Sequence, residues 1–293
     1  MQAMTAQIAD AASLGDWIGK TETALDDATA APVRALAATL GRADPPPLPR
    51  TALPPLWHWL YFLPMHPAGE LGEDGHARRG GFLPPVPLPR RMWAGGRLRW
   101  NLDNPLRVGD ALRRDSRIAS VGGKSGRSGE LVFVTVVHEL HNAQGLALTE
   151  EHDIVYRGAP QPGDPGPTPI AAPQDAAWQR ELTPDDVLLF RYSALTFNGH
   201  RIHYDRRYVT QTEGYPGLVV HGPLVATLLM DLLRRESPHS RVRAFQFKAV
   251  RPAFDGRPLR LAGRPSAGGA AADLWAQDHE GWLTMQATAE IEP

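Results

Sequence analysis

The C-terminal end of the chain alternates apolar and polar residues. From Leu283 to Ile291 every second residue is apolar, which predicts a strand that turns this set of side chains towards a core. Strand-like runs precede it at 241–250, 258–265 and 272–279. The run GPLVATLLMDLLRRE, with Pro223 in its first turn, predicts a long helix before these strands. The apolar run DVLLFRYSALTF, at 186–197, predicts a buried strand before that helix.

The first half of the chain predicts the same order of elements. In AAPVRALAATLG, Pro32 suits a helix start, Gly41 suits a helix end, and the apolar residues have helical spacing. Residues 56–63 predict a short helix, and four strand-like runs follow at 91–100, 110–121, 130–140 and 147–157. A helix and an antiparallel sheet, each occurring twice, indicate a double α+β fold.

A segment rich in Pro, Gly and Ala, RGAPQPGDPGPTPIAAPQDAAWQ, separates the two halves. Its composition cannot form a core and is typical of an extended linker. We therefore expect an N-terminal half at 1–156, a linker at 157–180 and a C-terminal half at 181–293.

Composition excludes several classes of function. The 293 residues carry a formal net charge of -1, so bulk charge gives no reason to expect a nucleic-acid or membrane-surface partner. The absence of cysteine excludes disulfides, thiolate metal sites and cysteine nucleophiles. No signal peptide and no apolar run of membrane-spanning length is visible. The expectation is a soluble, cytoplasmic protein.

The sequence HELH at 138–141 resembles half of a zinc-protease motif, but its histidines are three apart and not four. The segment also has the pattern of a strand, which would place His138 and His141 on opposite faces. We expect ordinary strand histidines here and no metal site.

The segment RGGFLPPVPLPRRMW, from Arg79 to Trp93, is stiff and irregular. Two interpretations stay open for it. It is either a surface connection or a cover over a binding cleft, in which Arg90 and Arg91 would meet a phosphate or a carboxylate.

The stretch SALTFNGHRIHYDRRYV, from Ser193 to Val209, contains the strongest candidate chemistry. Asn198-Gly199 could form a hairpin turn, but the residues after it lack the alternation of a returning strand. They instead gather two histidines with charged residues beside an apolar segment. No G-x-S-x-G motif is present, and carboxylate partners for a metal are not evident, so a histidine-based acid/base site remains.

These residues resemble the hydratase motif of the MaoC-like, (R)-specific enoyl thioester hydratases. In that family S-G-D-x-N-P-x-H follows a strand, and an H-G pair opens the long helix of a hot-dog fold. FNGHRIHYD and the later VVHGPLVATLLMDLL are similar to these two elements. The match places Phe197 at the glycine, Asn198 at the Asp, Arg201 at the Pro and His203 at the catalytic His, with His221-Gly222 as the helix-opening pair.

The variant motif and the segment DGHARRGGFLPPVPLPRRMWAGGRLRW are more similar to one branch of this family, the type 2 hydroxyacyl-thioester dehydratases and mesaconyl-C4-CoA (3-methylfumaryl-CoA) hydratases. The resemblance implies a double hot-dog fold, class α+β, in which the C-terminal half keeps the catalytic motif and the N-terminal half has lost it. It implies a CoA thioester as substrate, no cofactor, and a monomer or a homodimer.

The resemblance also assigns roles. His203 would be the base that deprotonates water, and Asn198, which cannot replace the family's acid, would orient that water. The N–H of Gly222 at the helix start would bind the enolate oxygen. Arg90, Arg91, Arg206 and Arg207 are candidates for the CoA phosphates or a substrate carboxylate.

The expected activity is reversible hydration of a 2-enoyl-CoA, with mesaconyl-C4-CoA as the expected substrate. A 3-hydroxyacyl-ACP or 3-hydroxyacyl-CoA dehydratase, a non-catalytic acyl-CoA-binding module and a hot-dog thioesterase remain as alternatives.

Overall fold

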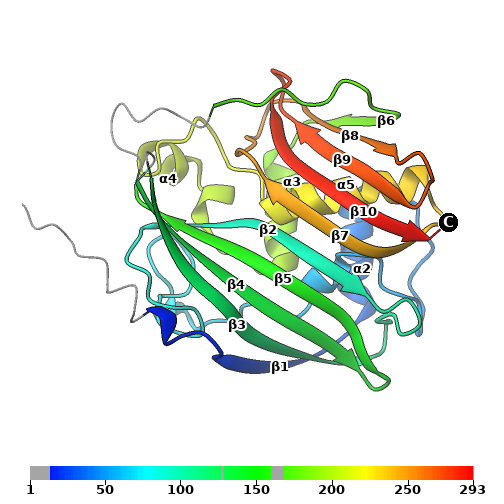
Figure 1. The fold of residues 1–293 in the computed structure, drawn as a ribbon, viewed down its shortest axis with the longest axis horizontal. Coiled ribbons are helices and arrows are strands. Elements are labelled where there is room, and N and C mark those ends of the chain that lie inside the picture. The colour runs from blue at the N-terminus through cyan, green and yellow to red at the C-terminus, as the bar shows by residue number, and fades with distance from the viewer. Residues whose placement is uncertain (1–13, 127–128, 160–167, 293) are drawn as a thin grey trace, which may run out of the picture.

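A computed structural model describes residues 14–126, 129–159 and 168–292 of the chain. Its strands form one antiparallel sheet of ten (Figure 1). The strands are β1 (Thr21–Asp27), β2 (Arg90–Trp100), β3 (Ala111–Gly126), β4 (Gly129–Asn142), β5 (Gly145–Arg157), β6 (Trp178–Leu182), β7 (Arg241–Ala249), β8 (Leu259–Pro265), β9 (Ala271–Gln277) and β10 (Leu283–Glu292).

The helical elements are fewer, and most of them are short. They are α2 (Ala30–Thr39), η1 (Trp57–Leu60), η2 (Ala68–Glu70), α3 (Asp186–Thr196), η3 (Arg201–His203), α4 (Arg206–Gln211) and α5 (Gly222–Glu236). In Figure 1, α2, α3 and α5 lie behind the sheet, on one of its faces.

The two halves of the chain repeat the same strand order. The sheet runs β1-β3-β4-β5-β2 and then β7-β10-β9-β8-β6, so each half contributes five strands with the same topology. The second strand of each half, β2 and β7, pairs with the other at the centre of the sheet. Gly95 permits this pairing, because a Cβ at that position would come within 2.5 Å of the Phe247 carbonyl oxygen. The α+β class and the repeated element order are therefore confirmed.

Helix α5 forms the core of the C-terminal half. Every residue from Leu224 to Leu233 is buried, and the helix packs against β6, β8, β9 and β10. Within it, the buried Asp231 carboxylate pairs with Arg42 from the first half and with Arg180 and Arg235 from the second. This carboxylate joins the two halves behind the sheet.

Most predicted elements are confirmed, including the long helix from Gly222 and the inward face of β10. The short helix expected at 56–63 is a single 3₁₀ turn. The linker expected at 157–180 lies partly outside the described residues, and β6 crosses its C-terminal boundary.

The strand predicted at 186–197 is wrong, because this segment is helix α3. Asp185 caps the helix by accepting a hydrogen bond from the Leu188 N–H. Leu189, Tyr192 and Ser193 are buried at helical spacing, whereas Phe190 is exposed. The apolar run therefore has one buried stripe and not two buried faces.

None of the helices in the described part of the chain is long and apolar enough to cross a membrane.

Candidate active site

His203 ends the short element η3 and is 7% exposed. Its Nδ1 lies 2.7 Å from the carbonyl oxygen of Val219, so Nδ1 carries the proton and donates it to that oxygen. Nε2 then carries the lone pair. Burial lowers the pKa of His203 to about 4, which leaves the ring neutral at neutral pH. The result is an oriented imidazole with a free basic nitrogen.

His221, the residue before α5, holds the ring of His203 in place. The two imidazoles stack with centroids 3.7 Å apart and 17° between their planes. His221 is fully buried, and its Nε2 shares a hydrogen bond of 2.8 Å with the hydroxyl of Ser193 on α3. Sequence reasoning gave His221 only a place at the helix opening, whereas the structure makes it the packing partner of His203.

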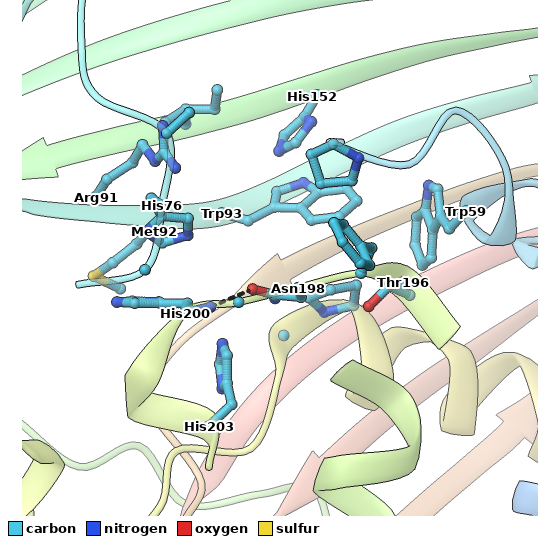
Figure 2. A pocket seen from close by; sticks show the side chains of 18 of the residues that line it. Trp59, His76, Arg91, Met92, Trp93, His152, Thr196, Asn198, His200 and His203 are labelled. Carbon is cyan, nitrogen blue, oxygen red and sulfur yellow. Dashed lines mark hydrogen bonds between the residues drawn. The ribbon is translucent and has the colours of Figure 1, made fainter. Parts of the chain in front are cut away.

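Asn198 follows the end of α3. Phe197, at the position of the family's glycine, adopts the left-handed conformation with φ of 49° and turns the chain into the motif. The Asn198 side-chain oxygen accepts a hydrogen bond from the His200 N–H at 3.0 Å (Figure 2). This turn occupies the side-chain oxygen and leaves the amide NH₂ as a donor. Asn198-Gly199 is therefore not a hairpin turn between strands.

Gly222 is the first residue of α5 and precedes Pro223, which has no N–H. In the described part of the chain no carbonyl or side chain accepts the Gly222 N–H. A Cβ added at Gly222 would make only an ordinary contact, 3.8 Å from the Trp93 carbonyl oxygen. The free donor at the helix N-terminus is suited to an anionic oxygen.

His203, Asn198 and Gly222 line one cavity of about 1920 Å³, which is formed by both halves of the chain. Asn198, His203 and Gly222 come from the C-terminal half, and His76, Arg91 and Trp93 come from the N-terminal half. Figure 2 shows Arg91 and His76 on the same side of the cavity as His200. Both ends of the segment from Arg79 to Trp93 line this cavity, so the segment forms part of the cavity wall, and its interpretation as a cover over a binding cleft stays a prediction.

The four candidate arginines lie in different surroundings. Arg90 pairs with Glu213 at 3.2 Å and lies against the ring of Tyr215. Arg206 forms ion pairs with Asp186 and Asp255, and Arg207 forms a hydrogen bond with Gln211. Both arginines lie outside the cavity lining.

Arg91 lines the cavity and has no ion-pair partner among the described residues.

A second group of buried polar side chains lines the cavity wall built by the N-terminal half. Each carboxylate oxygen of Glu150 forms a hydrogen bond of 3.0 Å, one with His58 Nε2 and the other with the Trp59 indole N–H. The ring of His152 lies against Trp93, with centroids 3.9 Å apart and 31° between the planes. Burial lowers the pKa of His152 to about 3. The sequence gave no signal for this group, because its members come from η1 and β5.

The histidines of HELH lie on strand β4, as predicted. His138 forms a hydrogen bond of 2.8 Å with the hydroxyl of Ser116, and His141 Nδ1 lies 3.7 Å from the Asp115 carboxylate. Among the described residues, a different group has potential metal-ligand atoms that all lie within 4.8 Å of one another. It consists of Asp74, His76 and His200. Asp74 and His76 lie at the start of the segment that resembles the family branch, but sequence reasoning gave them no role.

Three comparisons relate the chain to known proteins. The sequence model of the family described as hydroxyacyl-thioester dehydratase type 2 matches residues 56–255. Mesaconyl-C(4)-CoA hydratase from Chloroflexus aurantiacus is 50% identical over 278 residues, which are 94% of this chain and 96% of that protein.

Solved structures agree on the fold. A MaoC-like dehydratase superposes with a TM-score of 0.69 at 14% identity, covering 95% of this chain and 99% of the other. A Mycobacterium tuberculosis protein described as having a double hotdog fold superposes with a TM-score of 0.57 at 14% identity, covering 94% and 96%. The double hot-dog fold is confirmed, and the chain belongs to the hydroxyacyl-thioester dehydratase type 2 family.

Proposed function

We propose that this protein is a hydro-lyase that reversibly adds water to a 2-enoyl-CoA, with mesaconyl-C4-CoA as its substrate. The observation that carries the proposal is the oriented, neutral imidazole of His203 in one cavity with the free N–H of Gly222. The 50% sequence identity to the Chloroflexus aurantiacus mesaconyl-C(4)-CoA hydratase, over 94% of the chain, supports mesaconyl as the acyl group.

His203 acts as the base in this proposal. Its Nε2 takes a proton from a water molecule, and the water oxygen attacks the β-carbon of the thioester. The Asn198 amide orients the water. Because Asn198 Oδ1 is already bonded to the His200 N–H, the Nδ2 group is the part that remains for this task.

The Gly222 N–H stabilises the enolate oxygen that develops at the thioester. A helix N-terminus favours negative charge, and a donor that is already fixed needs no reorganisation during the reaction. Glycine also lets the thioester carbonyl approach the backbone closely.

Arg91 is the arginine that we assign to the free carboxylate of mesaconyl-C4-CoA. Its positive charge contributes to the lowered pKa of His76, His200 and His152, although burial is the larger cause for each. Figure 2 shows Arg91 on the same side of the cavity as His76 and His200. A charged hydrogen bond from Arg91 would hold the carboxylate next to the reacting double bond.

We assign the chain to the cytoplasm, with the CoA thioester as its substrate and no cofactor. In this proposal residues 181–293 carry the motif, residues 1–156 complete the cavity, and 157–180 connect them.

The test is an assay of the purified protein on mesaconyl-C4-CoA, crotonyl-CoA and octenoyl-CoA, followed by enoyl absorbance and by free thiol. We expect the absorbance to change at constant thiol, fastest with mesaconyl-C4-CoA. Preference for the unbranched substrates would refute the dicarboxylate assignment. Release of thiol would indicate a thioesterase, and binding without turnover would indicate an acyl-CoA-binding module.

Dehydration of a 3-hydroxyacyl thioester of fatty-acid type is the second candidate. The family description, which names a dehydratase, favours it, and the same groups would act in reverse. Faster dehydration of 3-hydroxyoctanoyl-CoA than hydration of mesaconyl-C4-CoA would select this alternative.

A further inference from the structure

The turn from Gly72 to His76 presents the imidazole of His76 to the cavity and pairs it with the carboxylate of Asp74. Asp74 Oδ1 accepts a hydrogen bond from the His76 N–H at 3.0 Å, and Asp74 Oδ2 lies 3.1 Å from His76 Nδ1. The Gly72 N–H closes the turn by donating to the His76 carbonyl at 2.7 Å. The carboxylate therefore holds one tautomer of His76 and leaves Nε2 for other chemistry.

This turn is fixed to the motif of the other half. The Arg201 N–H donates to the Asp74 carbonyl at 2.9 Å, and the Arg201 guanidinium donates to the Glu73 carbonyl at 3.0 Å. Gly75 has a φ of +87°, and a Cβ there would lie 1.9 Å from the Gly199 carbonyl oxygen. A glycine is required at this contact, so the turn and the motif pack as one unit.

Three imidazoles consequently form a row along the cavity. The ring centroids of His76 and His200 are 4.0 Å apart, and those of His200 and His203 are 5.4 Å apart. All three line the cavity, and Figure 2 shows His200 between the other two.

Hydration of an enoyl thioester needs two proton transfers, one from water and one to the α-carbon. His203 has one free nitrogen, and Asn198 has no titratable proton. We propose that the Asp74–His76 pair, supplied by the N-terminal half, is the second acid/base group of this site. This inference rests on the proposed hydratase function.

The proton balance is as follows. His203 Nε2 takes the water proton as the C–O bond forms, and the π electrons of the double bond move towards the α-carbon and the thioester oxygen. His76 Nε2–H gives its proton to the α-carbon and becomes neutral. Transfer through His200 or water returns the proton from His203 to His76. Dehydration runs the same steps backwards, with neutral His76 removing the α-proton.

The groups that face His76 set its pH dependence. Burial lowers its pKa, the Asp74 carboxylate opposes this effect, and the charges of Arg91 and Arg79 add to it. A substrate carboxylate on Arg91 would offset that charge in the complex. Hydration requires protonated His76, so its rate should fall as the pH rises through the pKa of His76.

The experiment compares wild type, His76→Gln, Asp74→Asn and the exposed control His239→Gln on the thioester that wild type hydrates fastest. We expect His76→Gln to lower kcat by about 10²-fold or more. Asp74→Asn should move the alkaline limb of the kcat profile to lower pH, because the imidazolium loses its carboxylate partner. His239→Gln should match wild type.

Outcomes against the inference are specific. A His76→Gln variant that keeps kcat within about tenfold of wild type would overturn it, as would an unmoved alkaline limb in Asp74→Asn. The isosteric Asp74→Asn variant provides the pH test if His76→Gln does not fold. Loss of wild-type activity with EDTA and recovery with Zn²⁺ would instead make Asp74, His76 and His200 metal ligands and refute the acid/base role.

The inference and the proposed function fail in different ways. If wild type hydrates no enoyl thioester, the proposed function is wrong and the inference falls with it. If wild type is active and the His76 and Asp74 variants behave like it, only the inference is wrong.

Discussion

The imidazole rings of His203 and His221 lie face to face, with centroids 3.7 Å apart and 17° between their planes. Two stacked imidazoles cannot both carry a positive charge in a buried site without strong repulsion. The stack, together with burial, therefore favours neutral rings. It also fixes the plane of His203, so that the free Nε2 has a defined direction.

Acidification should destabilise the protein through its buried histidines. Burial lowers the pKa to about 4 for His203 and His138 and to about 3 for His152, against an ordinary value of 6.5. Between these values and 6.5 the unfolded chain binds more protons, so stability falls as the pH falls. From pH 7.5 to 5, we expect a loss of about 2 kcal/mol per such histidine, measured by urea unfolding. An unchanged free energy of unfolding would contradict these neutral rings.

Introducing the acid of the MaoC-like motif with Asn198→Asp should shift the pH profile. The new carboxylate could still accept the His200 N–H, and it would lie near the row of imidazoles. A negative charge favours their protonated forms, so the acidic limb of kcat/KM should move up by about one pH unit. The measurement is a pH-rate profile of both proteins. A limb that stays in place would show that Asn198 is remote from the base.

Removing the charge of Arg91 should affect the dicarboxylate substrate selectively. We expect Arg91→Gln to lower kcat/KM for mesaconyl-C4-CoA by about 10- to 100-fold, the value of a charge-assisted hydrogen bond, with little change for crotonyl-CoA. The exposed Arg117→Gln is the control. Equal losses on both substrates would assign Arg91 to CoA binding or to stability.

Crowding the contact between the Gly72–His76 turn and the motif should lower activity beyond its effect on stability. Gly75→Ala and the control Gly269→Ala both place a side chain at positive φ, at a cost of about 1–2 kcal/mol each. A Cβ at Gly269 has open space, whereas at Gly75 it meets the Gly199 carbonyl. The midpoint temperature of thermal unfolding and kcat should both fall more for Gly75→Ala than for Gly269→Ala. Equal kcat values in the two variants would argue against a functional role for the turn.

The sequence predicted the repeated strand order well, because alternation in strands such as β10 is a local property. It failed at α3, where a continuous apolar run is compatible with a strand or a helix. The deciding signals were Asp185 as a cap and the helical spacing of Leu189 and Tyr192, and both were visible in the sequence.

The candidate site was predicted as far as its residues lie in one motif. Asn198, His203 and Gly222 share the cavity, as the resemblance implied, although their roles stay a prediction. The turn with Asp74 and His76 is more than a hundred residues away, and only the pairing of the two halves brings it to the motif. A single sequence carries no local signal for such a contact.

The central claim is that His203 is the base of a hydratase, and the most direct test is kcat/KM of wild type and His203→Gln on mesaconyl-C4-CoA at neutral pH. Both proteins should fold, because glutamine can still donate to the Val219 carbonyl. We predict a fall of about 10³-fold in the variant, within the usual contribution of general base catalysis. A variant that retains activity within about tenfold of wild type would contradict the account.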